Sequence, residues 1–180
     1  MAAEGEPLGT IVSVVFVALV GAAGLIDLHS RRIPNKLTLG ILVSGLALRS
    51  LEGFGSLASG LGGASLGLAI AVVLFGVGAL GGGDGKLLVG VGAFLGYEDF
   101  VGALLLIGVL GGLLGLVEGI RRGVILPAAL NALGMIRRWV TLGRSGVARN
   151  LNSPGAVAVP YGVAIALGAI VWWFWGGQIL

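Results

Sequence analysis

Long runs of apolar residues, separated by short polar clusters, form the basic pattern of this chain. A helix needs about 20 apolar residues to cross a hydrocarbon core of roughly 30 Å. Uncharged stretches of this kind recur along the sequence, so we expect an all-α, polytopic membrane helix bundle with about six spans. The expected spans are residues 8–26, 34–51, 57–80, 87–97, 100–117 and 156–175.

Two parts of this pattern are less regular. Segment 87–97 would be roughly 17 Å long as a helix, so it is either a short span or a re-entrant piece. Between the last two spans, the uncharged piece 123–136 contains Pro127 and is followed by several arginines. We expect an interfacial helix and a basic loop there, with a hairpin or a true span as the alternative. Residues 1–180 are expected to form a single membrane domain.

The distribution of charge agrees with six spans. With this count, all of the 11 lysines and arginines except Arg49 fall on one side of the membrane. Glu52, Glu98 and Asp99 fall on the side of Arg49. Positively charged loops mark the cytoplasmic side, so we expect both termini to lie outside.

Composition narrows the classes of protein that fit. The chain is 57% hydrophobic and 11% charged, and its mean hydropathy is +1.07. A soluble domain carries about 25% charged residues. The 36 glycines suit close helix packing in lipid. The absence of cysteine excludes a disulfide framework, and one histidine without cysteine argues against a conventional zinc site. We therefore expect no metal and no cofactor. We expect the single histidine, His29, in a solvated loop, with tuning of Asp27 as the alternative. The cluster 172–175 predicts an interfacial aromatic belt.

Asp27 and Asp84 are the two acids that stand out. Each follows a long uncharged run and lies near the expected cytoplasmic boundary. A carboxylate at the hydrocarbon edge is costly and is therefore a functional candidate. The alternative is a helix-end acid paired with a nearby base, Arg31 for Asp27 and Lys86 for Asp84.

If the fold brings the two carboxylates together, they would share one proton. The pair could then act as general acid and general base in the hydrolysis of a peptide bond. Two other classes of protein stay open. One is a small transporter that uses the aspartates as a proton relay, and the other is a non-catalytic membrane scaffold.

The surroundings of both aspartates carry recognisable motifs. The motif segments are D-L-H-S-R-R-I-P-N-K-L-T at 27–38, G-G-G-D-G-K-L-L at 81–88, V-G-A-F-L-G at 91–96 and V-P-Y-G at 159–162. Taken in order, they resemble the motifs of the type IV prepilin peptidases, which are GxGD membrane aspartic peptidases. Glycine beside an aspartate permits unusual backbone angles. The presenilin-like proteases, a related GxGD class, are larger and carry their first aspartate differently.

The resemblance implies roles for individual residues. Asp27 and Asp84 match the two catalytic aspartates, and Gly81 and Gly83 match the motif glycines. Lys86 matches the motif lysine, whose role is open between contact with substrate or lipid and tuning of Asp84.

The loop between the first two spans also matches the family. Pro34 and Asn35 match the entry to the second span, where a structural role is expected at least as much as a functional one. Arg31, Arg32 and Lys36, together with Lys86, are candidates to bind an acidic residue near the cleavage point of a substrate.

The family cleaves the basic leader peptide of type IV pilin, Flp pilin or archaellin precursors at the cytoplasmic membrane face. A cysteine-bearing N-terminal segment, present in many bacterial members, is not found here. The chain resembles the short form of Tad/Flp pilus systems and preflagellin peptidases, so we expect no N-methyltransferase activity.

We expect the protein in the inner (plasma) membrane. Its expected partners are a prepilin-like substrate and anionic lipid headgroups, not nucleic acid. The sequence leaves the oligomeric state open.

Overall fold

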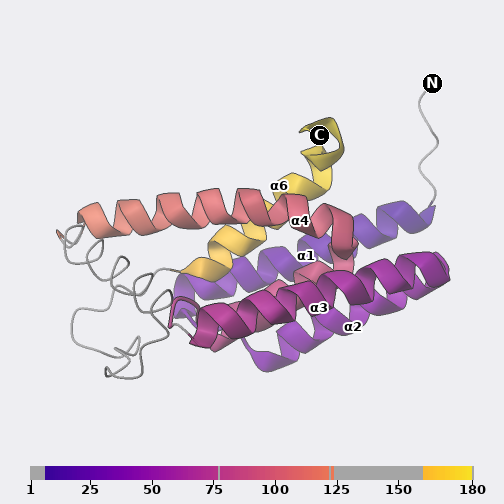
Figure 1. The fold of residues 1–180 in the computed structure, drawn as a ribbon, viewed down its shortest axis with the longest axis horizontal. Coiled ribbons are helices and arrows are strands. Elements are labelled where there is room, and N and C mark those ends of the chain that lie inside the picture. Colours follow the sequence, from indigo (N-terminus) through magenta and orange to yellow (C-terminus); the bar gives the residue numbers. More distant parts are fainter. Residues whose placement is uncertain (1–6, 77, 122, 124–159, 180) are drawn as a thin grey trace, which may run out of the picture.

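The computed structural model describes residues 7–76, 78–121, 123 and 160–179. This part of the chain forms α-helices and no strand, in agreement with the all-α prediction. The helices, packed side by side in Figure 1, are α1 (Pro7–Ser30), α2 (Asn35–Leu51), α3 (Phe54–Gly76), α4 (Gly82–Arg121) and α6 (Tyr161–Ile179).

Apolar side chains cover the outside of the bundle as well as its core. Phe16, Phe94 and Phe100 are buried, whereas Leu105 and Phe75 are 74% and 63% exposed. Outward-facing apolar surface of this extent suits contact with lipid rather than water. By length and composition, 3 described helices could cross a membrane, namely α1, α3 and α4. The chain is therefore an integral membrane protein.

Some parts of the topology prediction stay predictions. The described helices do not by themselves establish six spans or the side on which the termini lie. The expected interfacial helix and basic loop fall almost entirely on residues 124–155, which lie outside the described residues.

Helix α4 is the central element, since it contacts every other described helix. Its helical geometry breaks at Gly96, which has φ 76° and ψ 174°. A residue with a side chain rarely adopts this conformation, so glycine suits the position. Figure 1 shows the chain turning here, so that the second half of α4 runs back along the bundle. The break falls near the end of the segment expected at 87–97, before the one expected at 100–117.

Arg49 on α2 stabilises this break. Its Nε donates to the carbonyl of Phe94 at 2.8 Å, its Nη2 donates to the carbonyl of Leu95, and its Nη1 donates to Ser56 Oγ at 3.0 Å. A helix end leaves backbone carbonyls without partners. The planar guanidinium fork supplies donors to two of them. This structural role explains why Arg49 lies on the membrane side where the sequence otherwise places acidic residues.

Helices α3 and α4 approach each other closely through glycine. A Cβ atom on Gly63 would overlap the carbonyl oxygen of Gly92, and a Cβ on Gly92 would overlap the carbonyl oxygen of Gly63. A Cβ on Gly67 would lie 2.9 Å from the carbonyl oxygen of Leu88. Small residues permit this backbone approach within a membrane.

The aromatic cluster at the end of α6 divides between core and surface. Trp172 is only 7% exposed and donates from Nε1 to Asp99 Oδ1 at 3.3 Å. Trp173 stacks on Phe16 with ring centroids 4.6 Å apart. Phe174 and Trp175 are each 53% exposed. Successive helical residues point about 100° apart, so the four cannot share one outer face. Only Phe174 and Trp175 are placed for the expected belt.

Replacing Arg49 with alanine tests the stabilisation of the break. The buried carbonyls of Phe94 and Leu95 would lose their donors, which costs about 1–3 kcal/mol. We expect a lower thermal unfolding midpoint in detergent. Ser50→Ala on the same helix is the control, because Ser50 is exposed and bonds only to the carbonyl of Ala47. An equal midpoint for the two variants would contradict this role.

Two glycine substitutions on α4 test the close packing against α3. Gly92→Ala would force the backbones apart, and overpacking of this kind costs about 1–3 kcal/mol. Gly108→Ala meets nothing within 4 Å, so it should leave stability unchanged or raise it through helix propensity. Thermal unfolding of both variants checks the difference. Equal stability would show that this contact is not required.

Candidate active site

Asp27 lies in the last two turns of α1 and is only 4% exposed. The helix continues to Ser30 and ends where Arg31, with φ 52°, donates its N–H to the carbonyl of Asp27 at 2.8 Å. Such a left-handed residue is a common helix C-cap. Helix α1 therefore continues past the boundary expected at residue 26, and Asp27 lies inside it.

The carboxyl group of Asp27 faces the beginning of α6. The backbone amides of Gly162 and Val163 donate hydrogen bonds to it. These amides belong to the first turn of α6, where N–H groups have no partner within the helix. The second oxygen, Oδ2, is buried and has no hydrogen-bond partner. Asp27 thus fills the role of a helix cap while keeping one oxygen available.

Asp84 is the third residue of α4. The amide of Gly85 donates to the carbonyl of Gly81 at 3.0 Å, so Gly81 is the N-cap residue. The Asp84 carboxyl group reaches back to the amide of Gly81, as the acid at the third position of a capping box does. This local geometry explains the spacing of glycine and aspartate in the motif. Asp84 also accepts a hydrogen bond from the amide of Gly162.

The two aspartates meet at the amide of Gly162. This one backbone group donates to both carboxyl groups, and the two are close enough to repel each other. The structure thus brings together two residues whose proximity the sequence left open. Lys86 bonds to Asn35 and not to Asp84, so the pairing alternative does not describe Asp84, whereas Arg31 lies close enough to attract Asp27 electrostatically.

Two glycines make room for the carboxyl groups. A Cβ on Gly162 would lie 2.8 Å from Asp27 Oδ2 and 2.8 Å from Ile33 Cδ1. A Cβ on Gly81 would lie 2.8 Å from Asp84 Oδ2. Gly83 is less constrained, since its Cβ would make an ordinary contact with Ile33 at 3.5 Å.

Gly162 and the buried Ile33 were not among the site residues expected from the sequence. The signal for Gly162 was present in the V-P-Y-G segment at 159–162. That segment indicated a family motif, but nothing in it indicated that its glycine amide contacts both aspartates. Ile33 lies in the first motif and contacts both Gly162 and Gly83. It therefore packs between the beginning of α6 and the beginning of α4.

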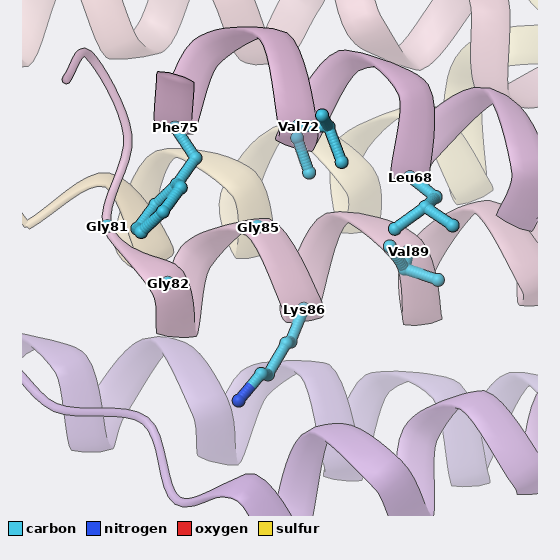
Figure 2. A pocket seen from close by; sticks show the side chains of 9 residues that line it. Leu68, Val72, Phe75, Gly81, Gly82, Gly85, Lys86 and Val89 are labelled. Atoms are coloured by element: carbon cyan, nitrogen blue, oxygen red, sulfur yellow. The ribbon is translucent and has the colours of Figure 1, made fainter. Parts of the chain in front are cut away.

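Lys86 is directed at α2 rather than at Asp84. Its Nζ donates to Asn35 Oδ1 at 2.7 Å. Figure 2 shows the Lys86 side chain pointing away from Phe75 and Val72. The polar residues of the first two motifs therefore bond to each other and connect the beginning of α4 to the beginning of α2.

The remaining residues of the first motif lie at the surface. Arg31, Arg32 and Lys36 are exposed at the end of the bundle that holds the aspartates. Pro34 is the N-cap of α2, one position before the helix rather than its first residue. His29 was expected in a loop but lies in the last turn of α1, with Nδ1 2.9 Å from the carbonyl oxygen of Leu25.

A groove of about 340 Å³ lies between α3 and the first half of α4, and neither aspartate is among the residues that line it. Figure 2 shows the side chains that line it. They are Leu68, Ala71, Val72 and Phe75 of α3, and Gly81, Gly82, Gly85, Lys86 and Val89 at the beginning of α4. Gly81 borders both the groove and the Asp84 carboxyl group. Within the described residues, no group of three or more His, Asp or Glu is placed to hold a metal ion.

Comparison with known proteins agrees with the motifs. The family model described as the type IV leader peptidase family matches residues 14–116, a stretch that contains both aspartates. A prepilin leader peptidase/N-methyltransferase of Aeromonas hydrophila is 33% identical over 115 residues, which cover 60% of this chain and 40% of that protein. No solved structure matches the chain significantly. Because the family model covers more than half of the sequence, the chain belongs to the type IV leader peptidase family.

Proposed function

We propose that this protein is an aspartic endopeptidase that removes the basic leader peptide of prepilin-like precursors. The observation that carries the proposal is the meeting of Asp27 and Asp84, from two different helices, at the amide of Gly162. In aspartic peptidases, two carboxyl groups lie close enough to share one proton, and the pair hydrolyses the peptide bond.

The proposed chemistry uses the pair in one protonation state. The ionised carboxylate takes a proton from water as the water oxygen bonds to the peptide carbonyl carbon, while the protonated partner donates to the carbonyl oxygen. The tetrahedral gem-diol then collapses: the carbon–nitrogen bond breaks as the protonated member of the pair gives its proton to the amine nitrogen, and the ionised member takes the proton of one gem-diol hydroxyl, which forms the new carboxyl group. One carboxylate is again ionised and its partner again protonated at the end of the cycle.

The beginning of α6 supports this arrangement. Its first-turn amides carry the partial positive charge of a helix N-terminus and face both carboxyl groups. That field stabilises the single negative charge that a shared-proton pair retains. The low exposure of Asp27 strengthens the interaction, because electrostatic effects grow where water is excluded.

Exposed bases around the site suit the proposed substrate. We infer that Arg31, Arg32 and Lys36 bind an acidic residue near the cleavage point, since they are exposed at this end of the bundle. The bias of lysine and arginine among the expected loops supports a cytoplasmic site in the inner membrane. The expectation that N-methyltransferase activity is absent remains a prediction.

Replacing each aspartate tests the mechanism. Asp27→Asn and Asp84→Asn each remove a group that can hold the shared proton. We expect each to lower kcat for a prepilin-like substrate by about a thousandfold or more. Leader removal by purified protein in detergent or vesicles is the measurement.

Glu98→Gln serves as the control, because Glu98 is exposed at the break in α4. Cleavage that survives both aspartate substitutions would overturn the proposed mechanism. Proton flux in vesicles that depends on the aspartates, without any cleavage, would favour the transporter alternative.

Gly162→Ala tests the position of the pair. The new Cβ would press on Asp27 Oδ2 and on Ile33 Cδ1, each at 2.8 Å. We expect kcat to fall about a hundredfold with little change in KM, because displacement of a catalytic group by about 1 Å has an effect of this size.

The double variant Gly162→Ala/Ile33→Val separates two causes. It removes the contact with Ile33 Cδ1 but keeps the contact with Asp27, so activity should stay low. Recovery in the double variant would show that packing against Ile33, and not the aspartate, explains the loss. Gly21→Ala on α1, which meets nothing within 4 Å, controls for a helical glycine substitution.

A further inference from the structure

The hydrogen bond between Lys86 and Asn35 links the two segments that carry the aspartates. Lys86 lies two residues after Asp84 in α4, and its ammonium group donates to Asn35 Oδ1 at 2.7 Å. Asn35 is the first residue of α2, and the short connection at 31–34 joins it to the end of α1, which carries Asp27. The bond therefore closes a short path along the chain from one aspartate to the other.

The backbone on both sides of this bond is held in place. Thr38 is only 3% exposed, and its Oγ1 donates to the carbonyl of Asn35 at 3.0 Å. On α4, Lys86 lies between Gly85 and Leu87, which are both buried. A hydrogen bond with a charged donor is stronger than one between neutral groups. Between two backbone segments that are held in this way, it restricts how the beginning of α4 lies against α2.

The same two helices also pack through apolar groups deeper in the bundle. A Cβ atom on Gly90 would lie 2.8 Å from Ile41 Cγ2, so α2 and α4 approach each other closely there. Gly90 is six residues from Asp84, whereas Lys86 is two residues from it. The bond to Asn35 thus extends the contact between α2 and α4 toward the aspartate.

This geometry indicates a role for Lys86 that differs from contact with substrate or lipid and from tuning of Asp84. Residues two apart on a helix do not face each other, so Lys86 and Asp84 point in different directions. The ammonium group of Lys86 is bonded to the side chain of Asn35. It therefore acts on where α4 begins relative to α2.

We propose that Asn35 and Lys86 are positioning residues that act as one unit and hold Asp84 in place relative to Asp27. This inference rests on the proposed function and adds a pair of residues that fixes the spacing of the two carboxyl groups. Neither side chain touches the reacting atoms. Their effect reaches Asp84 through the first turns of α4.

A double-mutant cycle tests whether the two residues act as a unit. Asn35→Ala removes the acceptor, Lys86→Met removes the donor, and the double variant removes both. We expect each single substitution to lower kcat about tenfold with little change in KM, since displacement of a catalytic group by about 1 Å can cost about a hundredfold. The double variant should be no slower than either single one, because residues that act as a unit have non-additive effects.

The cycle has two outcomes that would overturn the proposal. A loss of about a hundredfold in the double variant, the product of two independent effects, would show that the residues do not act through their bond. A raised KM in Lys86→Met, with both constants unchanged in Asn35→Ala, would show that Lys86 contacts the substrate directly.

A conservative substitution separates positioning from a general loss of stability. Asn35→Asp keeps an acceptor oxygen for Lys86, so its kcat should stay near that of the unsubstituted protein. Asn35→Asp/Lys86→Met lacks the donor and should be as slow as Lys86→Met alone. Ser50→Ala, which removes an exposed polar group elsewhere on α2, should leave kcat unchanged. All variants are assayed well below their thermal unfolding midpoints, and an equally low kcat for Asn35→Asp and Asn35→Ala would contradict the proposed role.

The two proposals fail in different ways. If cleavage survives Asp27→Asn and Asp84→Asn, the proposed function itself is wrong. If those variants are inactive while Asn35→Ala and Lys86→Met keep full kcat, only the positioning role is wrong.

Discussion

The hydrogen bonds from the amide of Gly162 to Asp27 and Asp84 are the constraint around which this end of the bundle is built. Three helices contribute to one small volume, because α1 brings Asp27, α4 brings Asp84 and α6 brings the donor. Two carboxyl groups at a membrane edge would otherwise be costly. The first-turn amides of α6 offset part of that cost and hold the two carboxyl groups close to each other.

The remainder of the fold holds these three helices in position. Helix α4 contacts all other described helices, carries Asp84 in its first turn and breaks at Gly96, after which its second half runs back along the bundle. Arg49 satisfies the carbonyls at the break, while glycine contacts keep α3 close to α4. A groove between the same two helices lies beside Gly81. Stability at one end of the bundle and the shape of the site at the other therefore depend on the same helix.

Several motif residues have a structural role that is separate from chemistry. Gly81 is the N-cap of α4 and leaves space for Asp84. Asn35 and Lys86, which belong to different motifs, bond to each other and connect α2 with α4. This contact explains why a basic residue follows the second aspartate without forming an ion pair with it. The motifs thus combine the two proposed catalytic groups with the contacts that place them.

The sequence by itself determined the all-α membrane class and the candidate aspartates, because hydropathy runs and the spacing of glycine to aspartate are local features. It also indicated Gly162 through its motif. Only the tertiary structure brought Asp27 to Asp84, joined Asn35 to Lys86, placed Arg49 on the carbonyls of α4 and buried Trp172. Each of these contacts joins residues far apart along the chain. They depend on how the helices rotate and pack, and hydropathy along one dimension does not encode that.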